Sequence, residues 1–439
     1  MIILSNKDLT SLKKQSLSQH QNSNKITSEK LPDARLTRDL VKHIKRGHRW
    51  IFSDCIEVVP QAPSGLYRLV FKGQFLGIGF YQAHTELSFR MLMLNQDPLG
   101  KSDITPRWMI KYLEERFCER ISLRQSLFRE DNNSFRLIYG EGDGFPGLVI
   151  DCYGAVAVFK CDQLYLEQYY DFKMMQEKIV EYFPHIEAFF IKRRKNVSSE
   201  DGAVSEHLEW LGGLEKHKNL EQVTFKENGM SFISNIREGS KTGFFLDQRD
   251  NRLMISRFSQ NKKVLNLFSY TGGFSLFAMK GGAKHVTSVD IAPKAILNVD
   301  ENFKLNGFNE SSSYESIAID AFKYLDEAIK NKLQFDMVIT DPPSFAPNKK
   351  SLEKAKSAYL KVFSDSIKLV KSNGLFVASS CSSHLTEEDF FNILEEALSK
   401  ARKVGSVIYR GSQPSDHPFP INMKELKYLK FAVIKLDAF

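Results

Sequence analysis

A cysteine and an aspartate each follow an apolar run in the last hundred residues, and their types could support a covalent reaction. Cys381 follows GLFVASS and is flanked by serines, and Asp341 follows MVIT. A thiolate at Cys381 could add to carbon 6 of a pyrimidine, which would make carbon 5 nucleophilic enough to take a methyl group. Most lone cysteines are core residues, so packing is the competing interpretation of Cys381.

Two prolines and an aromatic residue follow Asp341. Pro342 and Pro343 cannot donate backbone hydrogen bonds, so they predict a stiff, non-helical wall, and a carboxylate at its edge suits a flat heterocycle. Enzymes that methylate exocyclic amines tend to have an aromatic residue immediately after the second proline, whereas here Ser344 precedes Phe345. This spacing counts against an amine target. We assign Pro342, Pro343 and Phe345 to substrate binding.

A turn of small residues joins a predicted strand, residues 264–268, to a predicted helix, residues 274–280. Glycines at such a turn let backbone amides approach a ligand that any Cβ would keep away. The turn does not match G-x-G-x-x-G, the spacing that binds a pyrophosphate. It therefore predicts an adenosine cofactor without phosphates, of which S-adenosylmethionine is the common one. The predicted cofactor residues here are Phe268, Ser269, Tyr270, Thr271, Gly272 and Gly273.

Asp290, Asp320 and Asp341 end three consecutive predicted strands. Because the carboxyl ends of parallel strands meet at one edge of a sheet, these carboxylates would lie together and could hold a ribose, an adenine amine and a reacting base. We assign Asp290, Asp320, the following Ala321 and Asp341 to cofactor binding, and Asp341 also to catalysis together with Cys381. A turn aspartate or a helix-cap aspartate is the alternative for each acid.

Strands and helices alternate from about residue 263 to residue 401, which predicts an α/β domain with a doubly wound, mostly parallel sheet. Two final strands separated by a loop rather than a helix predict one antiparallel strand at that edge. A hairpin that turns at residues 227–229 and a helix that begins near Asp247 precede the alternation. We assign residues 216–439 to this domain.

The chain before residue 216 divides into three predicted regions. Residues 1–33 are rich in Lys, Asn, Ser and Gln and predict a mostly disordered extension of open role. Short strands separated by Gly, Pro and Asn predict a small β-barrel over residues 34–100. Residues 101–215 predict a small α+β domain without chemistry of its own, with a helix at 105–128 and a glycine-rich connection, EGDGFPG.

Basic residues gather in RLTRDLVKHIKRGHRW, at the start of the predicted barrel. Basic side chains at near-helical spacing beside Trp50 suit a phosphate backbone, and we assign Arg46 and Arg49 to RNA contact. A second basic run, residues 192–195, could extend this track. A solvated helix face and a solvated strand end are the alternatives for the two runs.

The 439 residues carry a formal net charge of +8, which favours a polyanionic partner. Five cysteines without a C-x-x-C pair argue against a disulfide scaffold and a zinc ribbon, and for a reducing compartment. Cys381 and His384 lack a second metal-ligand pair, so we expect no metal. No apolar run is long enough for a signal peptide or a membrane span. We therefore expect a cytoplasmic protein that does not bind membranes.

Five motifs together resemble those of the bacterial large-subunit ribosomal RNA cytosine-5 methyltransferases, which are class I S-adenosylmethionine enzymes. They are TGFFLDQRDNR, NLFSYTGGFS, DPPSF, SCS and QPSDHP. KRGHRWIFSDCI is similar to the start of the family's RNA-binding PUA domain, and FRLIYGEGDGFPGLVIDCYG is similar to its central α+β domain. The resemblance covers nearly all of the chain from Arg35 and implies a C-terminal Rossmann-like catalytic domain.

The resemblance implies a role at each matching position. The glycine turn and Asp290 would hold the methionine and ribose ends of S-adenosylmethionine, Asp320 its adenine, and Asp341 the target cytosine. Cys381 would be the nucleophile, and Gln248 would lie near the cofactor. Large-subunit ribosomal RNA is the implied partner. The modified nucleotide, the assembly stage of the substrate and the oligomeric state, with a homodimer among the alternatives, stay open.

Two other functions also stay open from the sequence. Related N7-guanine enzymes share an LD-x-R segment, so methylation at a ring nitrogen or an exocyclic amine of RNA is one alternative, in which Cys381 is dispensable and Asp341 is not. An inactive RNA-binding assembly protein is the other, and it would need a broken cofactor turn. The missing pyrophosphate fingerprint disfavours a dinucleotide dehydrogenase.

Overall fold

The computed structural model describes residues 31–58, 62–97, 106–194, 206–308, 313–346 and 349–438. Apart from its last three residues, the predicted extension 1–33 lies outside these ranges, as does Lys195 of the second basic run. The chain divides into two compact units. Unit 1 comprises residues 1–125, 144–150 and 155–220, and unit 2 comprises residues 126–143, 151–154 and 221–439.

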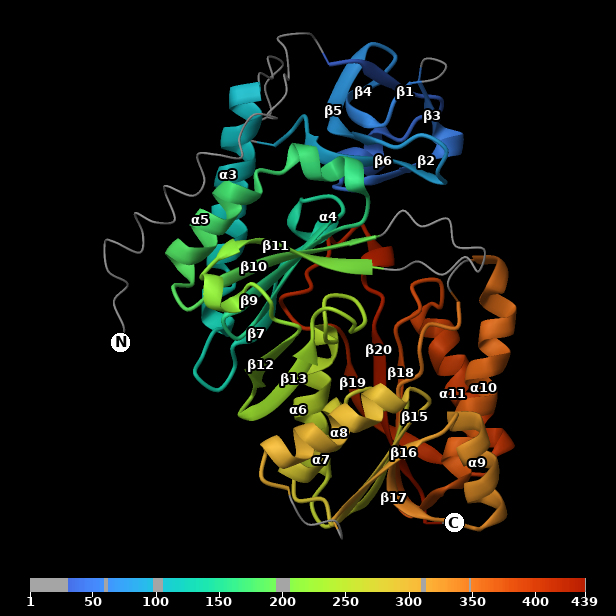
Figure 1. The fold of residues 1–439 in the computed structure, drawn as a ribbon. Coiled ribbons are helices and arrows are strands. Elements are labelled where there is room, and N and C mark those ends of the chain that lie inside the picture. Colours follow the sequence, from blue (N-terminus) through green and yellow to red (C-terminus); the bar gives the residue numbers. More distant parts are fainter. Residues whose placement is uncertain are drawn as a thin grey trace, which may run out of the picture. The chain divides into compact units, whose positions relative to one another are not determined.

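Unit 1 begins with a six-stranded, barrel-like sheet in the order β2-β6-β5-β4-β1-β3 (Figure 1). The predicted strands LYRLVF, LGIGFY and LSFRMLML all form. Lys72 and Gly73 join the first two with φ angles of 47° and 80°, the left-handed pair that a two-residue hairpin loop needs. The elements are β1 (Asp33–Leu36), α2 (Val41–Lys45), β2 (Trp50–Phe52), β3 (Ile56–Glu57), β4 (Gly65–Phe71), β5 (Gln74–Tyr81) and β6 (Leu87–Leu94).

The rest of unit 1 contains a mixed sheet and two helices that pack together. β10 pairs in parallel with β9 and antiparallel with β11, and α3 contacts α5. The elements are α3 (Pro106–Ser122), β9 (Val156–Cys161), α5 (Phe172–Tyr182), β10 (Ala188–Arg194) and β11 (Glu206–Gly213).

Two features of this region differ from the prediction. α3 ends at Ser122 instead of Phe128, where the Ser122 hydroxyl bonds the Glu119 carbonyl and so competes with the helical backbone. The sequence does not predict β11, because EHLEWLGG combines charged residues with two glycines. Its charges find partners across the sheet, since Lys160 Nζ lies 2.7 Å from Glu206 Oε1.

The first two residues of the second basic run, Lys192 and Arg193, are neutralised within the protein. The Lys192 side chain is 2% exposed, and its Nζ lies 3.9 Å from Glu206. Arg193 pairs with Glu167 at 2.6 Å and also with Glu209. Because three glutamates face these two cations, Lys192 and Arg193 do not contribute to a basic track for RNA, which corrects that prediction for both. Arg194 is exposed, and its part in such a track stays a prediction.

Unit 2 is built on a seven-stranded sheet in the order β16-β15-β14-β17-β18-β20-β19 (Figure 1). β20 runs in the opposite direction to the other six strands of this sheet, so the doubly wound, mostly parallel sheet is confirmed. The antiparallel strand lies one position inside the edge, because the last strand inserts between the two before it. The strands are β14 (Lys263–Leu267), β15 (His285–Asp290), β16 (Tyr314–Ala318), β17 (Phe335–Thr340), β18 (Val370–Ser380), β19 (Gly405–Gly411) and β20 (Lys430–Leu436).

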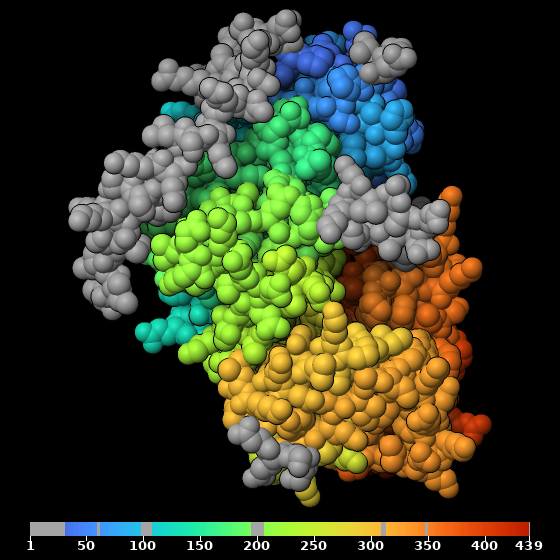
Figure 2. Space-filling view, in the orientation of Figure 1, coloured from blue at the N-terminus to red at the C-terminus, as the bar shows by residue number. Residues whose placement is uncertain are grey.

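Alternation along the strands divides the core of unit 2 into two layers. Successive side chains point to opposite faces of a sheet, so Val264 joins a cluster with α6 and α7, and Leu265 joins a cluster with α9, α10 and α11. Helices therefore cover both faces of the seven-stranded sheet (Figure 1). The yellow-to-orange segments of unit 2 form one continuous surface (Figure 2). The helices are α6 (Arg249–Phe258), α7 (Gly273–Lys280), α8 (Pro293–Leu305), α9 (Ala321–Lys330), α10 (Leu352–Lys368) and α11 (Glu387–Lys400).

Unit 2 also contains the predicted hairpin. Asn228 and Gly229 form its turn with φ angles of 46° and 81°. The hairpin strands are β12 (Gln222–Glu227) and β13 (Met230–Asn235). Three further elements of the described residues are β7 (Ser134–Tyr139), α4 (Gly140–Asp143) and β8 (Leu148–Tyr153).

Candidate active site

The predicted cofactor turn follows β14 and leads into α7. Phe268, Tyr270 and Gly272 have φ angles of 58°, 48° and 82°, so the backbone is left-handed at three of five positions. This conformation costs a residue with a Cβ about 1–3 kcal/mol and persists where surrounding contacts hold it. One such contact joins the Tyr270 amide to Asp290 Oδ2 at 2.9 Å and ties the turn to the end of β15.

The turn leaves polar groups unmet, as a polar ligand would require. Ser269 Oγ and Thr271 Oγ1 are shielded from solvent and have no hydrogen-bond partner within the described ranges. A Cβ at Gly273 would lie 2.9 Å from Arg252 Cδ, so this bare backbone is what lets α7 start so close to α6. The strained turn and its unmet hydroxyls fit the polar end of a nucleoside cofactor.

Asp290 and Asp320 lie at the predicted edge, and both already accept backbone hydrogen bonds. Asp290 takes one amide on each oxygen, from Tyr270 and from Ala292, which leaves further lone pairs for ribose hydroxyls. Asp320 takes two first-turn amides of α9 on Oδ1 and is the N-cap of that helix, directly before Ala321. The helix-cap alternative therefore holds for Asp320, and its predicted contact with adenine stays a prediction.

Asp341 follows β17 and lies at the centre of a hydrogen-bonded set. Gln248 is 4% exposed, and its Nε2 donates to both Asp341 oxygens at 3.2 and 3.1 Å and to Ser379 Oγ at 2.9 Å. Asn251 donates in turn to Gln248 Oε1 at 2.7 Å. Burial raises the pKa of Asp341 to about 6 despite the hydrogen bond from Ser379, and the charge of Asp247 adds to the rise. Gln248 therefore orients a carboxyl group that is partly protonated near neutral pH.

Cys381 follows β18, which pairs in parallel with β17, so Cys381 and Asp341 lie at the same edge. Burial raises the pKa of the Cys381 thiol to about 12, and the charges of Asp341 and Asp247 add to the rise against the opposing charges of Lys241 and Lys430. The thiol is therefore neutral and weakly reactive until a cation or a base changes its surroundings.

Hydroxyl groups and a buried ammonium group fix the backbone beside Cys381. Ser382 Oγ lies 2.9 Å from both Ser344 Oγ and Tyr359 OH, which links the two loops at the edge. Lys430 is 6% exposed and donates to the Ser382 carbonyl at 2.6 Å and to two further carbonyls. The segment that carries the thiol is thus held from two sides.

The predicted substrate residues of the DPPSF loop have different surroundings. Pro342 is buried and Pro343 is exposed. The Phe345 ring packs against Tyr359, with ring centroids 4.8 Å apart, and lies 6.5 Å from Phe268. Phe345 therefore supports the loop from the core side, and Pro343 presents the exposed ring of the wall.

The two arginines of unit 1 that we assigned to RNA contact differ in their exposure to solvent. Arg46 follows α2 and is exposed. Arg49 is 7% exposed, and its guanidinium donates to the Met91 and Leu92 carbonyls at 3.4 and 3.1 Å. Arg49 is therefore buried and held by two backbone carbonyls, and this placement argues against the RNA contact predicted for it.

Comparison with known proteins places these features in a family. Residues 191–431 match the S-adenosylmethionine-dependent methyltransferases, and residues 34–93 match PUA-like domains. The ribosomal RNA large subunit methyltransferase I of Alteromonas mediterranea is 35% identical over 399 residues, which cover 90% of this chain and 96% of that protein. The chain belongs to this methyltransferase family. The ribosomal RNA large subunit methyltransferase of Deinococcus radiodurans is 30% identical, with 92% and 97% of the two chains covered.

Family membership confirms the methyltransferase activity, the S-adenosylmethionine cofactor and the PUA-like fold of the first sheet. A solved methyltransferase, SMU.776 complexed with SAH, is 25% identical with a TM-score of 0.78, and the match covers 92% of this chain and all of that one. Among the described helices, none has both the length and the apolar character needed to cross a membrane.

This methyltransferase site also contains contacts that sequence reasoning missed. The Tyr428 hydroxyl donates to Asp247 Oδ2 at 2.5 Å. Arg249 and Asp416, both buried, pair at 2.7 Å. Breaking such a buried pair by removing one partner costs about 3–5 kcal/mol of stability. The Arg249–Asp416 pair therefore holds the start of α6 in place, and with it the adjacent Gln248. The signal was present in the sequence, since LDQR and QPSDHP supply three of these four residues.

Cys381 is expected to react slowly with iodoacetamide at pH 8 when no ligand is bound. A thiol with a pKa of about 12 has roughly 10³-fold less thiolate than an ordinary cysteine with a pKa of about 8.5. Its alkylation rate should therefore keep rising with pH beyond about pH 10. Peptide mass spectrometry after timed alkylation measures the rate, with Cys381→Ser as the background. A rate at pH 8 equal to that of a free cysteine would contradict this expectation.

Proposed function

We propose that the protein methylates carbon 5 of a cytosine in large-subunit ribosomal RNA, with Cys381 as the nucleophile. The names of the Alteromonas and Deinococcus relatives support this RNA as the substrate. The observation that carries the choice of carbon 5 is the position of Cys381, next to Asp341 on adjacent strand ends. Methylation of a nitrogen needs no thiol at this position.

The residues of the edge divide the proposed reaction between them. Bound S-adenosylmethionine supplies an electrophilic methyl group and a positive charge that favours the Cys381 thiolate. After the thiol proton passes to solvent, Cys381 Sγ would add to carbon 6, and carbon 5 would take the methyl group as S-adenosylhomocysteine leaves. A solvent base would then remove the carbon 5 proton, which restores the double bond and expels the thiolate. Asp341, oriented by Gln248, holds the base, which must leave its stack to reach the edge.

RNA that contains 5-fluorocytidine tests the proposal, because fluorine at carbon 5 cannot leave as the proton does and the enzyme stays bound to carbon 6. We expect a covalent adduct of protein and RNA when S-adenosylmethionine is present. We also expect ribosomal RNA from cells that lack the protein to lose one 5-methylcytidine in nucleoside mass spectrometry. No adduct, together with the loss of a nitrogen-methylated nucleoside, would favour the alternative chemistry.

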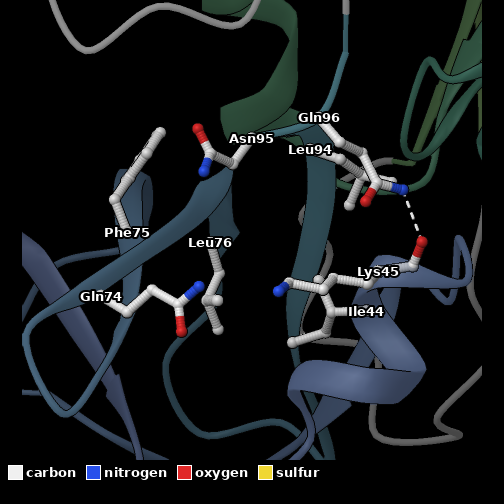
Figure 3. A pocket seen from close by; sticks show the side chains of 8 residues that line it. All are labelled: Ile44, Lys45, Gln74, Phe75, Leu76, Leu94, Asn95 and Gln96. Atoms are coloured by element: carbon white, nitrogen blue, oxygen red, sulfur yellow. Dashed lines mark hydrogen bonds between the residues drawn. The ribbon is translucent and has the colours of Figure 1, made fainter.

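We extend the proposal to RNA contact by the PUA-like sheet of unit 1. A pocket opens there between α2, the start of β5 and the end of β6 (Figure 3). Gln74, Asn95 and Gln96 supply amide groups, Phe75 supplies a ring, and Lys45 supplies a positive charge. Amides can hydrogen-bond base edges, a ring can stack on an unpaired base, and an ammonium group can contact phosphate.

Replacing Lys45 with glutamate is expected to weaken RNA binding and leave S-adenosylmethionine binding unchanged. Loss of one phosphate contact lowers the slope of log affinity against log salt concentration by about 0.7–0.9. Filter binding at several salt concentrations measures the slope, and calorimetry measures cofactor binding. Lys111→Glu is the matched control, because Lys111 lies on α3 of the same unit and its side chain is 74% exposed. Equal losses of RNA affinity in Lys45→Glu and Lys111→Glu would show that the loss comes from the change in net charge alone.

We also propose that the protein acts in the cytoplasm. All five cysteines are unpaired, as expected in a reducing compartment. Cell fractionation with an epitope-tagged protein tests the location. A homodimer stays one alternative for the oligomeric state, and light scattering of the purified protein distinguishes it from a monomer.

A further inference from the structure

Asp247 lies in the active site with one carboxylate oxygen unused. Its Oδ2 accepts the Tyr428 hydroxyl at 2.5 Å. Its Oδ1 is shielded from solvent and accepts no hydrogen bond from any residue in the described part of the chain. A buried acceptor without a donor is unfavourable, so Oδ1 is suited to accept a hydrogen bond from a ligand.

Asp247 lies near the Cys381 end of the edge, although Phe245, two residues before it, packs against Tyr270 of the cofactor turn. Its partner Tyr428 lies two residues before β20, which pairs with β18, the strand that leads to Cys381. The cofactor turn follows β14, and β17 separates β14 from β18. After burial, the charge of Asp247 contributes to the raised pKa values of both Cys381 and Asp341, so Asp247 lies close to both groups. A base that reaches Cys381 would therefore come within reach of Asp247.

We propose that Asp247 selects cytosine over uracil by accepting a hydrogen bond from the amine on carbon 4. Cytosine has an amino donor at carbon 4, whereas uracil has a carbonyl acceptor there. A carboxylate oxygen attracts the amino group of cytosine and repels the carbonyl oxygen of uracil. Such a mismatch is a strong basis for rejecting uracil. Tyr428 keeps the carboxylate in place by occupying the other oxygen. The inference rests on the proposed function, since it concerns a pyrimidine that is methylated at carbon 5.

Asp247→Asn is the decisive variant, because an amide can present either a donor or an acceptor to the base. Once the nucleotide that the wild-type enzyme methylates is mapped, two RNA fragments are made with cytosine or uracil at that position. We expect the ratio of kcat/KM for cytosine to that for uracil to fall by about 10- to 100-fold in Asp247→Asn. S-adenosylmethionine affinity, measured by calorimetry, should stay unchanged, because the inference assigns Asp247 Oδ1 to the base and not to the cofactor.

Two further variants complete the test. Tyr428→Phe keeps the carboxylate and removes the hydroxyl that positions it, so the same ratio should fall several-fold even if Asp247→Asn does not fold. Asp250→Asn is the matched control, because Asp250 lies three residues further along and its side chain is 55% exposed. It should leave the ratio unchanged.

The outcomes separate this inference from the proposed function. If the wild-type enzyme methylates cytosine at carbon 5 and the ratio is unchanged in both Asp247→Asn and Tyr428→Phe, the inference is overturned and the proposed function stands. A loss of S-adenosylmethionine affinity with an unchanged ratio also overturns it and assigns Asp247 to the cofactor. If the wild-type enzyme methylates carbon 5 of neither RNA, the proposed function fails and the inference fails with it.

Discussion

Replacing Cys381 with alanine is expected to abolish methyl transfer, with a loss of at least about 10⁴-fold in kcat, as when other enzymes lose a covalent nucleophile. Without the sulfur, no bond forms to carbon 6, and carbon 5 is too weak a nucleophile to take the methyl group. Incorporation of labelled methyl groups into large-subunit ribosomal RNA measures the loss, and the adduct with 5-fluorocytidine RNA should disappear with it.

A second cysteine provides the control for this substitution. Cys118→Ala changes a partly buried cysteine of α3 in unit 1 and should leave methyl transfer intact. Calorimetry should show that Cys381→Ala still binds S-adenosylmethionine, because the cofactor turn follows β14 and Cys381 follows β18. A Cys381→Ala protein that methylates the RNA at the wild-type rate would exclude covalent catalysis and favour a nitrogen target.

Replacing Asp341 with asparagine is expected to lower activity by about 10²- to 10⁴-fold and to stabilise the protein at pH 8. The folded-state pKa of about 6 lies above the ordinary value of about 3.9, so folding favours the protonated group. The contribution of Asp341 to stability is therefore full below about pH 4 and is lost as pH rises through 6. At pH 8 the buried carboxylate is a net cost of up to about 3 kcal/mol, which a neutral amide removes.

Thermal unfolding at pH 8 and at pH 5 tests the direction of this change. The increase in melting temperature of Asp341→Asn over wild type should be smaller at pH 5 than at pH 8. Asp336→Asn, at the other end of β17, is a matched control for which we expect the opposite change in stability. There the hydrogen bond from Lys371 lowers the pKa of Asp336 although burial opposes it. The ionised form of Asp336 stabilises the fold above its unfolded pKa, so Asp336→Asn should lower the melting temperature at pH 8. An Asp341→Asn protein that is less stable than wild type at pH 8 would contradict the argument.

Local patterns predicted the elements of the fold because each pattern depends on neighbouring residues. Val264 and Leu265 face different cores whatever strands lie beside them, since the side-chain period of a strand is two. Asn228 and Gly229 adopt the left-handed angles of a hairpin turn for reasons contained in those two residues. The same holds for the glycine turn after β14, which is why the cofactor class could be predicted.

Local patterns failed for long charged side chains, whose role depends on distant partners. Arg46 and Arg49 stand in the same basic run, yet Arg46 is exposed, whereas Arg49 is buried and donates to two carbonyls of β6. Lys192 and Arg193 look like a basic track and are neutralised by glutamates. Charge counts in a sequence therefore do not distinguish a nucleic-acid surface from an internal ion pair.

The sequence by itself determined the methyltransferase fold, the cofactor turn and the presence of Asp341 and Cys381 at neighbouring strand ends. Only the tertiary structure decided which polar groups meet there. Asp247 and Tyr428 are separated by 181 residues, and Gln248 and Ser379 by 131. Hydrogen bonding and burial depend on positions in space, so no local pattern could show that Asp247 keeps one oxygen free of hydrogen bonds from the described residues near Cys381.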